Sequence, residues 1–317
     1  MKREGSPWTG LGVVCAKEVA DHLGSVRMRI LEVLMVLAAT GATYVAGQQL
    51  HGTVEQGSFA FLKLFTTASQ PLPSFVSFLS FFIPLVAIGL GFDAVNGEHN
   101  RGTLSLVLSQ PIYRDALLAG KFLAAMVTLL LVLVGLWLLT TGLGIVFLGL
   151  PPSGDSVARG LCFFVATLFY AGIWLAVAML CSVLFRQTAT SALAALGVWL
   201  LFVVLWPIGA QFVAQVVHPA PFGSLQALLA RHELATALSR VSPNTLYSEA
   251  VTALLHPAVR SLGPVFAFQL YRAVLGTALP LGQSLVLVWP QLTSLVAGVV
   301  LLFTATYLIF QRREIRA

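Results

Sequence analysis

The sequence predicts an all-α integral membrane protein with six transmembrane helices, and two observations support this prediction. Of its 317 residues, 58% are hydrophobic and only 9% are charged, whereas roughly a quarter of a soluble domain is Asp, Glu, Lys or Arg. Six apolar stretches are also long enough to supply the roughly 20 residues that cross a bilayer as a helix. This composition excludes an ordinary water-soluble enzyme, a disordered protein and a disulfide-rich secreted module.

The first element is an amphipathic stretch over residues 8–29, at the start of a single transmembrane domain that covers residues 1–317. Its apolar side chains recur at spacings of three and four residues among Lys17, Glu18 and Asp21. This pattern predicts an interfacial helix that lies at the cytoplasmic surface of the membrane.

The six spans are predicted at residues 30–50, 75–92, 122–148, 161–185, 192–217 and 285–310. Pro84, Pro207 and Pro290 lie inside spans. Because proline has no backbone N–H and clashes with the preceding turn, each is expected to kink its helix or to mark a break in the backbone hydrogen bonds.

Basic residues predict the orientation of the spans, because short cytoplasmic segments carry an excess of Lys and Arg. With both chain ends inside, the inner segments hold Lys2, Arg3, Lys17, Arg27, Arg29, Arg101, Arg114, Lys121, Arg186, Arg312, Arg313 and Arg316. The short outer segments hold only Lys63 and Arg159. Both termini are therefore predicted to be cytoplasmic. The net charge of +6 comes from loops and forms no continuous patch for nucleic acid.

Between the last two spans, residues 218–284 are predicted to form an extracytoplasmic segment. Two short amphipathic helices are expected in it, at residues 224–241 and 244–255, separated by Ser-Pro and His-Pro breaks. Its histidines, His218, His232 and His256, are not clustered, which is more typical of surface residues than of a metal site.

The sequence shows no catalytic, cofactor-binding or metal motif. A nucleotide-binding P-loop would need a glycine at Asp115 and a Ser or Thr at Phe122, on either side of Gly120-Lys121. The stretch that starts His232-Glu233 has Thr236 where a zinc protease has its second histidine. We therefore expect no enzyme activity and no ATP hydrolysis by this chain.

The polar loop at residues 93–115 is the part of the sequence that is most informative about function. Its main features are Asp93, Glu98, Arg101, Gly102, Thr103, Leu104, Leu106, Pro111 and Arg114. Gly102 breaks the backbone before Thr103, a suitable N-cap for a short helix with an apolar face. Such a helix, held between two spans, is well placed to receive a push from a cytoplasmic partner. The alternative is a solvated connector.

The loop resembles the cytoplasmic loop of type-2 ABC export permeases. The resemblance rests on Asp-x-x-x-x-Glu-x-x-x-Gly-Thr-Leu from Asp93, on Ser-x-Pro-Ile-x-Arg from Ser109, and on the later Gly120-Lys121. Within the family, the chain is most similar to permeases associated with copper-site maturation of nitrous oxide reductase and with gliding motility. The stretch at residues 16–21 resembles the family's elbow helix, and residues 310–315 resemble its basic tail.

The resemblance implies a permease of the bacterial or archaeal inner membrane that exports an unidentified substrate. It implies a homodimer or heterodimer of permeases in the lipid bilayer, with two copies of a cytoplasmic ABC ATPase that binds ATP and Mg. The loop would contain the coupling helix: Glu98 and Arg101 would make polar contacts with the ATPase, while Leu104 and Leu106 would fill its groove.

The transport pathway is predicted to lie between two protomers, lined by the first, second and fifth spans. Gln211 and Gln215 of the fifth span are a polar pair on one helical face, equally consistent with contacts between helices. Two other functions stay open on the residues alone: a secondary transporter or channel without an ATPase, and an intramembrane enzyme that uses the outer histidines.

Overall fold

The computed structural model describes residues 10–51, 59–68, 72–102, 113–149, 151–219, 225–259, 262 and 279–312, and within these ranges it contains helices and no strand. The helices are α1 Leu11–Gly24, α2 Val26–His51, α3 Ala60–Thr66, α4 Phe75–Gly91, α5 Asn96–Asn100, α7 Arg114–Leu148, α8 Gly154–Leu184, α9 Thr188–Leu200, the π-helix η1 Leu201–Leu205, α10 Trp206–Val217, α11 Leu225–Ser239, α12 Pro243–Leu255 and α14 Leu281–Arg312.

Six helical stretches in the described ranges are long and apolar enough to cross a membrane, which confirms the predicted fold class and all six spans. They are Val26–Leu50, Phe75–Asn100, Arg114–Leu148, Gly154–Leu184, Thr188–Val217 and Leu281–Arg312. Most begin several residues before the predicted apolar stretch, because polar and charged first turns continue the same helices beyond the hydrophobic part.

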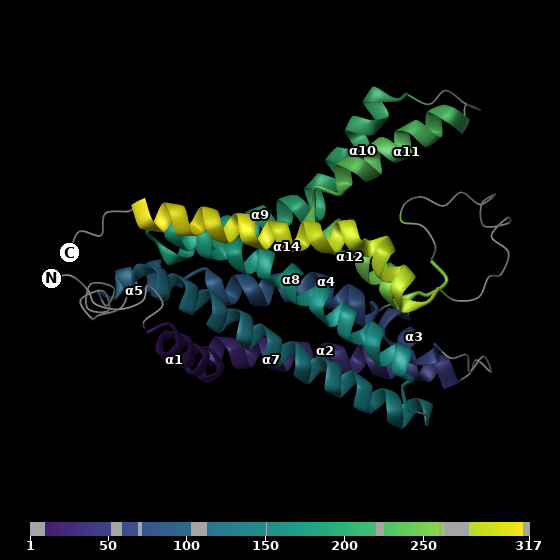
Figure 1. Cartoon of the computed structure of the whole chain (residues 1–317), viewed down its shortest axis with the longest axis horizontal. Helices are drawn as coiled ribbons and strands as arrows, with labels where there is room; N and C mark the ends of the chain where they lie inside the picture. The colour runs from purple at the N-terminus through teal and green to yellow at the C-terminus, as the bar shows by residue number, and fades with distance from the viewer. Residues whose placement is uncertain are drawn as a thin grey trace.

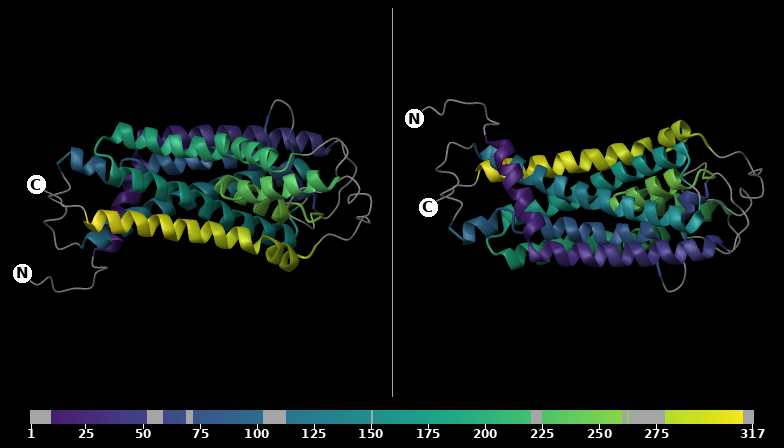
Figure 2. Two further views of the ribbon diagram at one scale, coloured as in Figure 1. Left: turned by 90° about the horizontal axis from the view of Figure 1, so that it is seen from above. Right: turned by 90° about the horizontal axis from the view of Figure 1, so that it is seen from below.

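The spans lie side by side, and α1 runs across one end of them (Figures 1 and 2). This end also contains α5, the start of α7 and the end of α14, whereas α3 and the starts of α8 and α14 lie at the opposite end (Figure 1). Following the prediction from charge, we call these the inner end and the outer end.

Helix α8 forms the centre of the bundle and packs against α4, α7, α9, α12 and α14. Lipid tails are as apolar as the helices, so close packing through small residues is what holds membrane helices together. At Gly91 of α4, a Cβ atom would lie only 2.9 Å from the Cβ of Ala178 in α8. The second and fourth spans therefore need this glycine to approach each other.

The interfacial helix α1 ends at Gly24, five residues before the predicted end at Arg29. Ser25 has an extended backbone (ψ 137°) that separates α1 from α2. Its hydroxyl donates to the carbonyl of His22 at 2.8 Å and accepts from the backbone N–H of Met28 at 3.2 Å. One serine thus terminates the first helix and caps the second.

The outer segment is partly built into the bundle. In this segment α12 packs between α8 and α14, whereas α11 packs on α10, the end of the fifth span, and these two helices lean away from the others (Figure 1). Tyr247 of α12 is fully buried and stacks on Tyr170, near the middle of α8, with ring centroids 4.3 Å apart. An amphipathic pattern predicts such a helix but not how deep it lies.

Arg159 of α8 fixes α12 and α14 at the outer end. Its side chain has no exposed surface, and it donates to Asp155 (2.7 Å), to the Leu254 carbonyl (3.1 Å) and to the Ser284 hydroxyl (3.1 Å). It also donates to the carbonyl of Leu279. A single guanidinium therefore satisfies groups from α8, the end of α12 and the start of α14.

Candidate functional site

At the inner end, Lys121 of α7 joins three helices. Its Nζ lies 2.7 Å from Glu98 Oε1 of α5 and 2.9 Å from Glu18 Oε1 of α1, and its side chain is only 4% exposed. Lys17 Nζ lies 3.2 Å from the same oxygen of Glu18. We call Glu18, Glu98, Gly120 and Lys121 the inner junction.

Electrostatics explains why these charges tolerate burial. Desolvation alone would raise the pKa of Glu18, but the charges and hydrogen bonds of Lys121 and Lys17 outweigh it and hold the pKa below its ordinary value. Glu18 therefore stays ionised and binds Lys121 as a carboxylate.

Gly120 allows α1 to reach this position. A Cβ at Gly120 would lie 2.8 Å from Cγ1 of Val14, a contact that no real side chain makes without movement. The Gly120-Lys121 pair, which resembled part of a family motif, thus has a physical role: the glycine admits the interfacial helix, and the lysine binds it.

Helix α5 is held in place by the end of α8 and the region after it. The hydroxyl of Ser182 accepts from the backbone N–H groups of Val95 (3.0 Å) and Asn96 (3.2 Å). The Asn96 amide donates to the carbonyl of Phe185 at 3.2 Å. Sequence analysis missed Ser182, because a serine near the end of an apolar span carries no pattern that marks it.

Asp93 contacts α2 within the same chain. It binds Arg27 at 2.9 Å, and the guanidinium of Arg27 lies 5.0 Å from the ring centroid of Phe92. Asp93 and Glu98, both predicted as coupling residues, thus bind side chains of other helices in the same chain. Glu98, which is 8% exposed, lies in the inner junction, and its predicted contact with a cytoplasmic ATPase stays a prediction.

The solvent-exposed part of the loop at the inner end begins after Glu98. Arg101 and Gly102 are exposed, and Gly102 ends α5 with a left-handed φ of +69°, which favours glycine. Thr103, Leu104, Leu106 and Pro111 lie outside the described residues, and Arg114 opens α7. Residues 103–112 of the predicted coupling loop at 93–115 are therefore bracketed by two segments that the bundle fixes.

The start of α7 is also tied to the end of the last span. Asp115 accepts from the Tyr307 hydroxyl at 3.1 Å and from the amide of Gln311. A movement of the loop between α5 and α7 would thus be transmitted to α1, α8 and α14 together.

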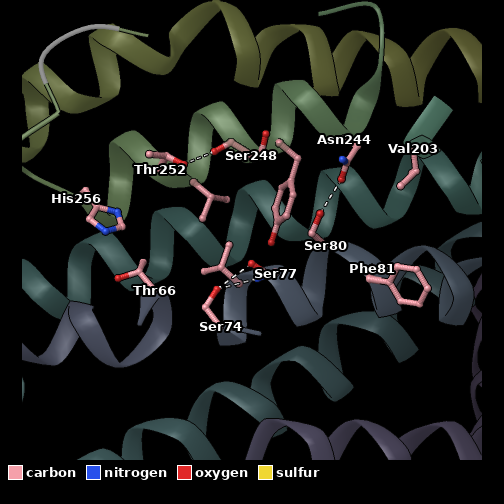
Figure 3. Close-up of a pocket in the computed structure, with 13 residues that line it drawn as sticks. Thr66, Ser74, Ser77, Ser80, Phe81, Val203, Asn244, Ser248, Thr252 and His256 are labelled. Atoms are coloured by element: carbon pink, nitrogen blue, oxygen red, sulfur yellow. Dashed lines mark hydrogen bonds between the residues drawn. The ribbon is translucent and has the colours of Figure 1, made fainter. Parts of the chain in front are cut away.

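Towards the outer end, a cavity of about 390 Å³ lies between α3, α4, η1 and α12 (Figure 3). We call it the outer cavity; it is lined by Thr66, Ser74, Val76, Ser77, Ser80, Phe81, Val203, Asn244, Tyr247, Ser248, Val251, Thr252 and His256.

The lining of the outer cavity combines hydroxyl and amide groups with apolar side chains, and among the described residues it carries no acidic or basic side chain apart from His256. The Ser80 hydroxyl donates to the side-chain amide oxygen (Oδ1) of Asn244 at 2.6 Å, which joins α4 to α12 (Figure 3). Desolvation lowers the pKa of His256, so its imidazole is neutral at physiological pH. The cavity can therefore hydrogen-bond a polar solute without presenting a fixed charge to it.

Gln211 and Gln215 are exposed on α10 and do not line the outer cavity. Among the residues that the structure describes, no group of three or more His, Cys, Asp or Glu side chains is placed to hold a metal ion.

Comparison with known proteins gives consistent matches. A family model described as ABC-2 family transporter protein matches residues 13–315. The chain is 28% identical over 196 residues to the probable ABC transporter permease protein NosY of Stutzerimonas stutzeri, covering 62% of this chain and 67% of the relative. It is 29% identical over 204 residues to the corresponding Pseudomonas aeruginosa protein, covering 63% and 68%.

Proposed function

This chain belongs to the ABC-2 family of transporter proteins, and we propose that it exports its substrate with energy from a separate ATPase subunit bound at the inner end. Family membership makes it a membrane permease subunit of an ABC transporter and confirms the predicted family. We further propose that two permease subunits and two ATPase subunits assemble in the inner membrane of a prokaryotic cell, with both permease termini cytoplasmic.

The observation that carries the proposal is the inner junction. A docking loop can transmit a push only if its two ends are attached to the spans. Glu98 is attached to α7 and α1 through Lys121, and α5 is attached to α8 through Ser182. Closure of the ATPase pair would thus move α1, α7 and α8 as one body rather than bend a loose connector.

Docking is tested with the double variant Leu104→Asp and Leu106→Asp. Two charges in an apolar groove would be buried without partners, so we expect loss of the ATPase from the purified complex, with normal insertion of the permease. Binding is measured by co-purification of a tagged permease with its ATPase.

The matched control is Thr190→Asp, which adds negative charge at an exposed inner position outside the loop and should keep the complex. A complex that survives the double variant would refute the docking site. Transport by the purified permease alone would instead favour a channel or a secondary transporter.

We propose that the outer cavity belongs to the transport pathway. Cysteines at Ser77 and Thr252, introduced after replacement of the native cysteines, should react with a membrane-impermeant maleimide added from the outer side. Leu138→Cys is the control, because Leu138 is 57% exposed on an apolar surface of α7 that faces lipid in this arrangement, and it should stay unlabelled. Equal labelling of all three positions, or none at Ser77 and Thr252, would contradict the assignment.

A further inference from the structure

The fifth span contains a break whose missing hydrogen bond is supplied from another helix. Between α9 and α10, η1 adopts the π-helical pattern, in which an N–H bonds the carbonyl five residues earlier. The N–H of Trp206 follows this pattern and donates to the Leu201 carbonyl. The next donor in the pattern would be residue 207, which is proline and has no N–H. The carbonyl of Phe202 is therefore left without a backbone partner in this pattern.

Ser242 supplies the missing donor. Its hydroxyl donates to the Phe202 carbonyl at 2.8 Å, and the residue has no exposed surface. Ser242 is the N-cap of α12, where a serine normally accepts a hydrogen bond from its own helix. Its side chain makes no such capping bond here. The hydroxyl therefore serves the fifth span instead of its own helix.

A second bond fixes the same turn. The indole N–H of Trp206 donates to the carbonyl of Leu238, in the last turn of α11, at 2.8 Å. The two bonds run in opposite directions between the break in the fifth span and the turn that joins α11 to α12. Because α11 also packs on α10, this turn connects the leaning α10–α11 pair to α12 and hence to α8 and α14.

We propose that Ser242 is a positioning residue that replaces the amide missing at Pro207 and holds the α10–α11 pair in register with α12. The inference concerns the geometry of the chain itself and goes beyond its use of an ATPase. Without the hydroxyl, the part-buried Phe202 carbonyl would lose this donor. We expect the loss to shift the equilibrium from an α10–α11 pair held against α12 to a detached pair by roughly ten- to a hundredfold.

The test measures the distance between nitroxide labels in the full chain in lipid nanodiscs. Labels at Val216→Cys on α10 and Leu161→Cys on α8, positions 63% and 51% exposed, report the α10–α11 pair against the core. The native cysteines are first replaced, and an excess of unlabelled chain restricts the signal to pairs within one molecule. No ATPase is needed, so failure of the docking proposal would leave this measurement intact.

We expect one narrow distance for the parent protein and an added population of different distance for Ser242→Ala. The decisive variant combines Ser242→Ala with Pro207→Ala, because an alanine in place of the proline restores a backbone N–H that can bond the Phe202 carbonyl. The double variant should return to the parent distance, which a general packing defect at Ser242 would not do.

Ser239→Ala is the matched control; it keeps the carbonyl that accepts from Ser242 N–H at 3.0 Å and should match the parent. A parent-like distribution in Ser242→Ala would overturn the proposal, as would failure of Pro207→Ala to restore it. If Ser242→Ala alone does not accumulate as folded protein, recovery of folded protein in the double variant supports the proposal, and its absence refutes it.

Discussion

Replacement of Lys121 by methionine is expected to destabilise the permease by about 3–5 kcal/mol, the usual effect of removing one partner from a buried ionic group. Glu18 and Glu98 both bind Lys121, and the variant would remove the buried cation between their carboxylates and leave only the exposed Lys17 beside Glu18. The interfacial helix and α5 should then separate from α7. The expected result is a large drop in the melting temperature of the purified protein, accompanied by loss of ATP-driven transport.

Two variants separate this effect from a general loss of charge. Lys17→Met removes the other cation beside Glu18, but Lys17 is 63% exposed, and exposed pairs contribute only about 0–1 kcal/mol. The triple variant Lys121→Met, Glu18→Gln and Glu98→Gln removes the whole ionic group and should recover much of the stability. A Lys121→Met protein as stable as Lys17→Met would refute the account.

The pH dependence of stability provides an independent check on the destabilisation expected for Lys121→Met. With the pKa of Glu18 lowered, its ionised form stabilises the native protein above the ordinary carboxyl value of 4.5, and this contribution is lost as the pH falls through the folded pKa. In Lys121→Met, Glu18 loses the cation that most lowers its pKa while burial still raises it, so protonation of Glu18 should stabilise the folded variant. The stability difference between variant and parent should therefore narrow as the pH falls from 7 towards 5.

Replacement of Arg159 by methionine is expected to have an effect of similar size, about 3–5 kcal/mol, at the outer end. The variant leaves the carbonyls of Leu254 and Leu279 and the hydroxyl of Ser284 without their common donor. Hydrogen–deuterium exchange should increase at the end of α12 and the start of α14. It should stay unchanged in α1 and α5.

Arg159→Lys tests the geometry of the guanidinium. An ammonium is a point charge without a planar fork, so it cannot reproduce the same set of contacts, and we expect an intermediate loss. Arg231→Met, on the partly exposed surface of α11, is the control for loss of one positive charge. If hydrogen–deuterium exchange at α12 and α14 is the same in Arg159→Met as in the parent protein, these helices are held by packing alone.

The spans could be predicted from the sequence because length and apolarity decide whether a helix crosses a membrane. The partners of the charged residues could not. Lys121 was recognised as an inner basic residue and as part of a Gly-Lys pair but not as a partner of Glu18, which lies 103 residues away in the chain. Arg159 was counted as a charge in an outer loop, because a buried arginine is recognisable only from the groups around it.

The sequence identified the loop of the candidate site but not the contacts that its residues make within the chain. The loop at residues 93–115 was identified, yet Asp93 and Glu98 turned out to bind other helices of the same chain. The outer cavity was missed, because its hydroxyls come from helices that are distant in sequence and are individually unremarkable. Pro207 marked a break in the fifth span, but no pattern linked it to Ser242.

The bonds of Arg159 also set an order for biosynthesis. Its partners Leu254, Leu279 and Ser284 follow it by 95, 120 and 125 residues, so at roughly 5–20 residues per second it waits on the order of ten seconds for them. Until then Asp155, a helical turn away, is the one partner in its set of side-chain bonds that has already been synthesised. The outer end of the bundle can therefore close only when the last span emerges from the ribosome, and a nascent chain that stalls before Ser284 would present an incompletely paired arginine to quality control.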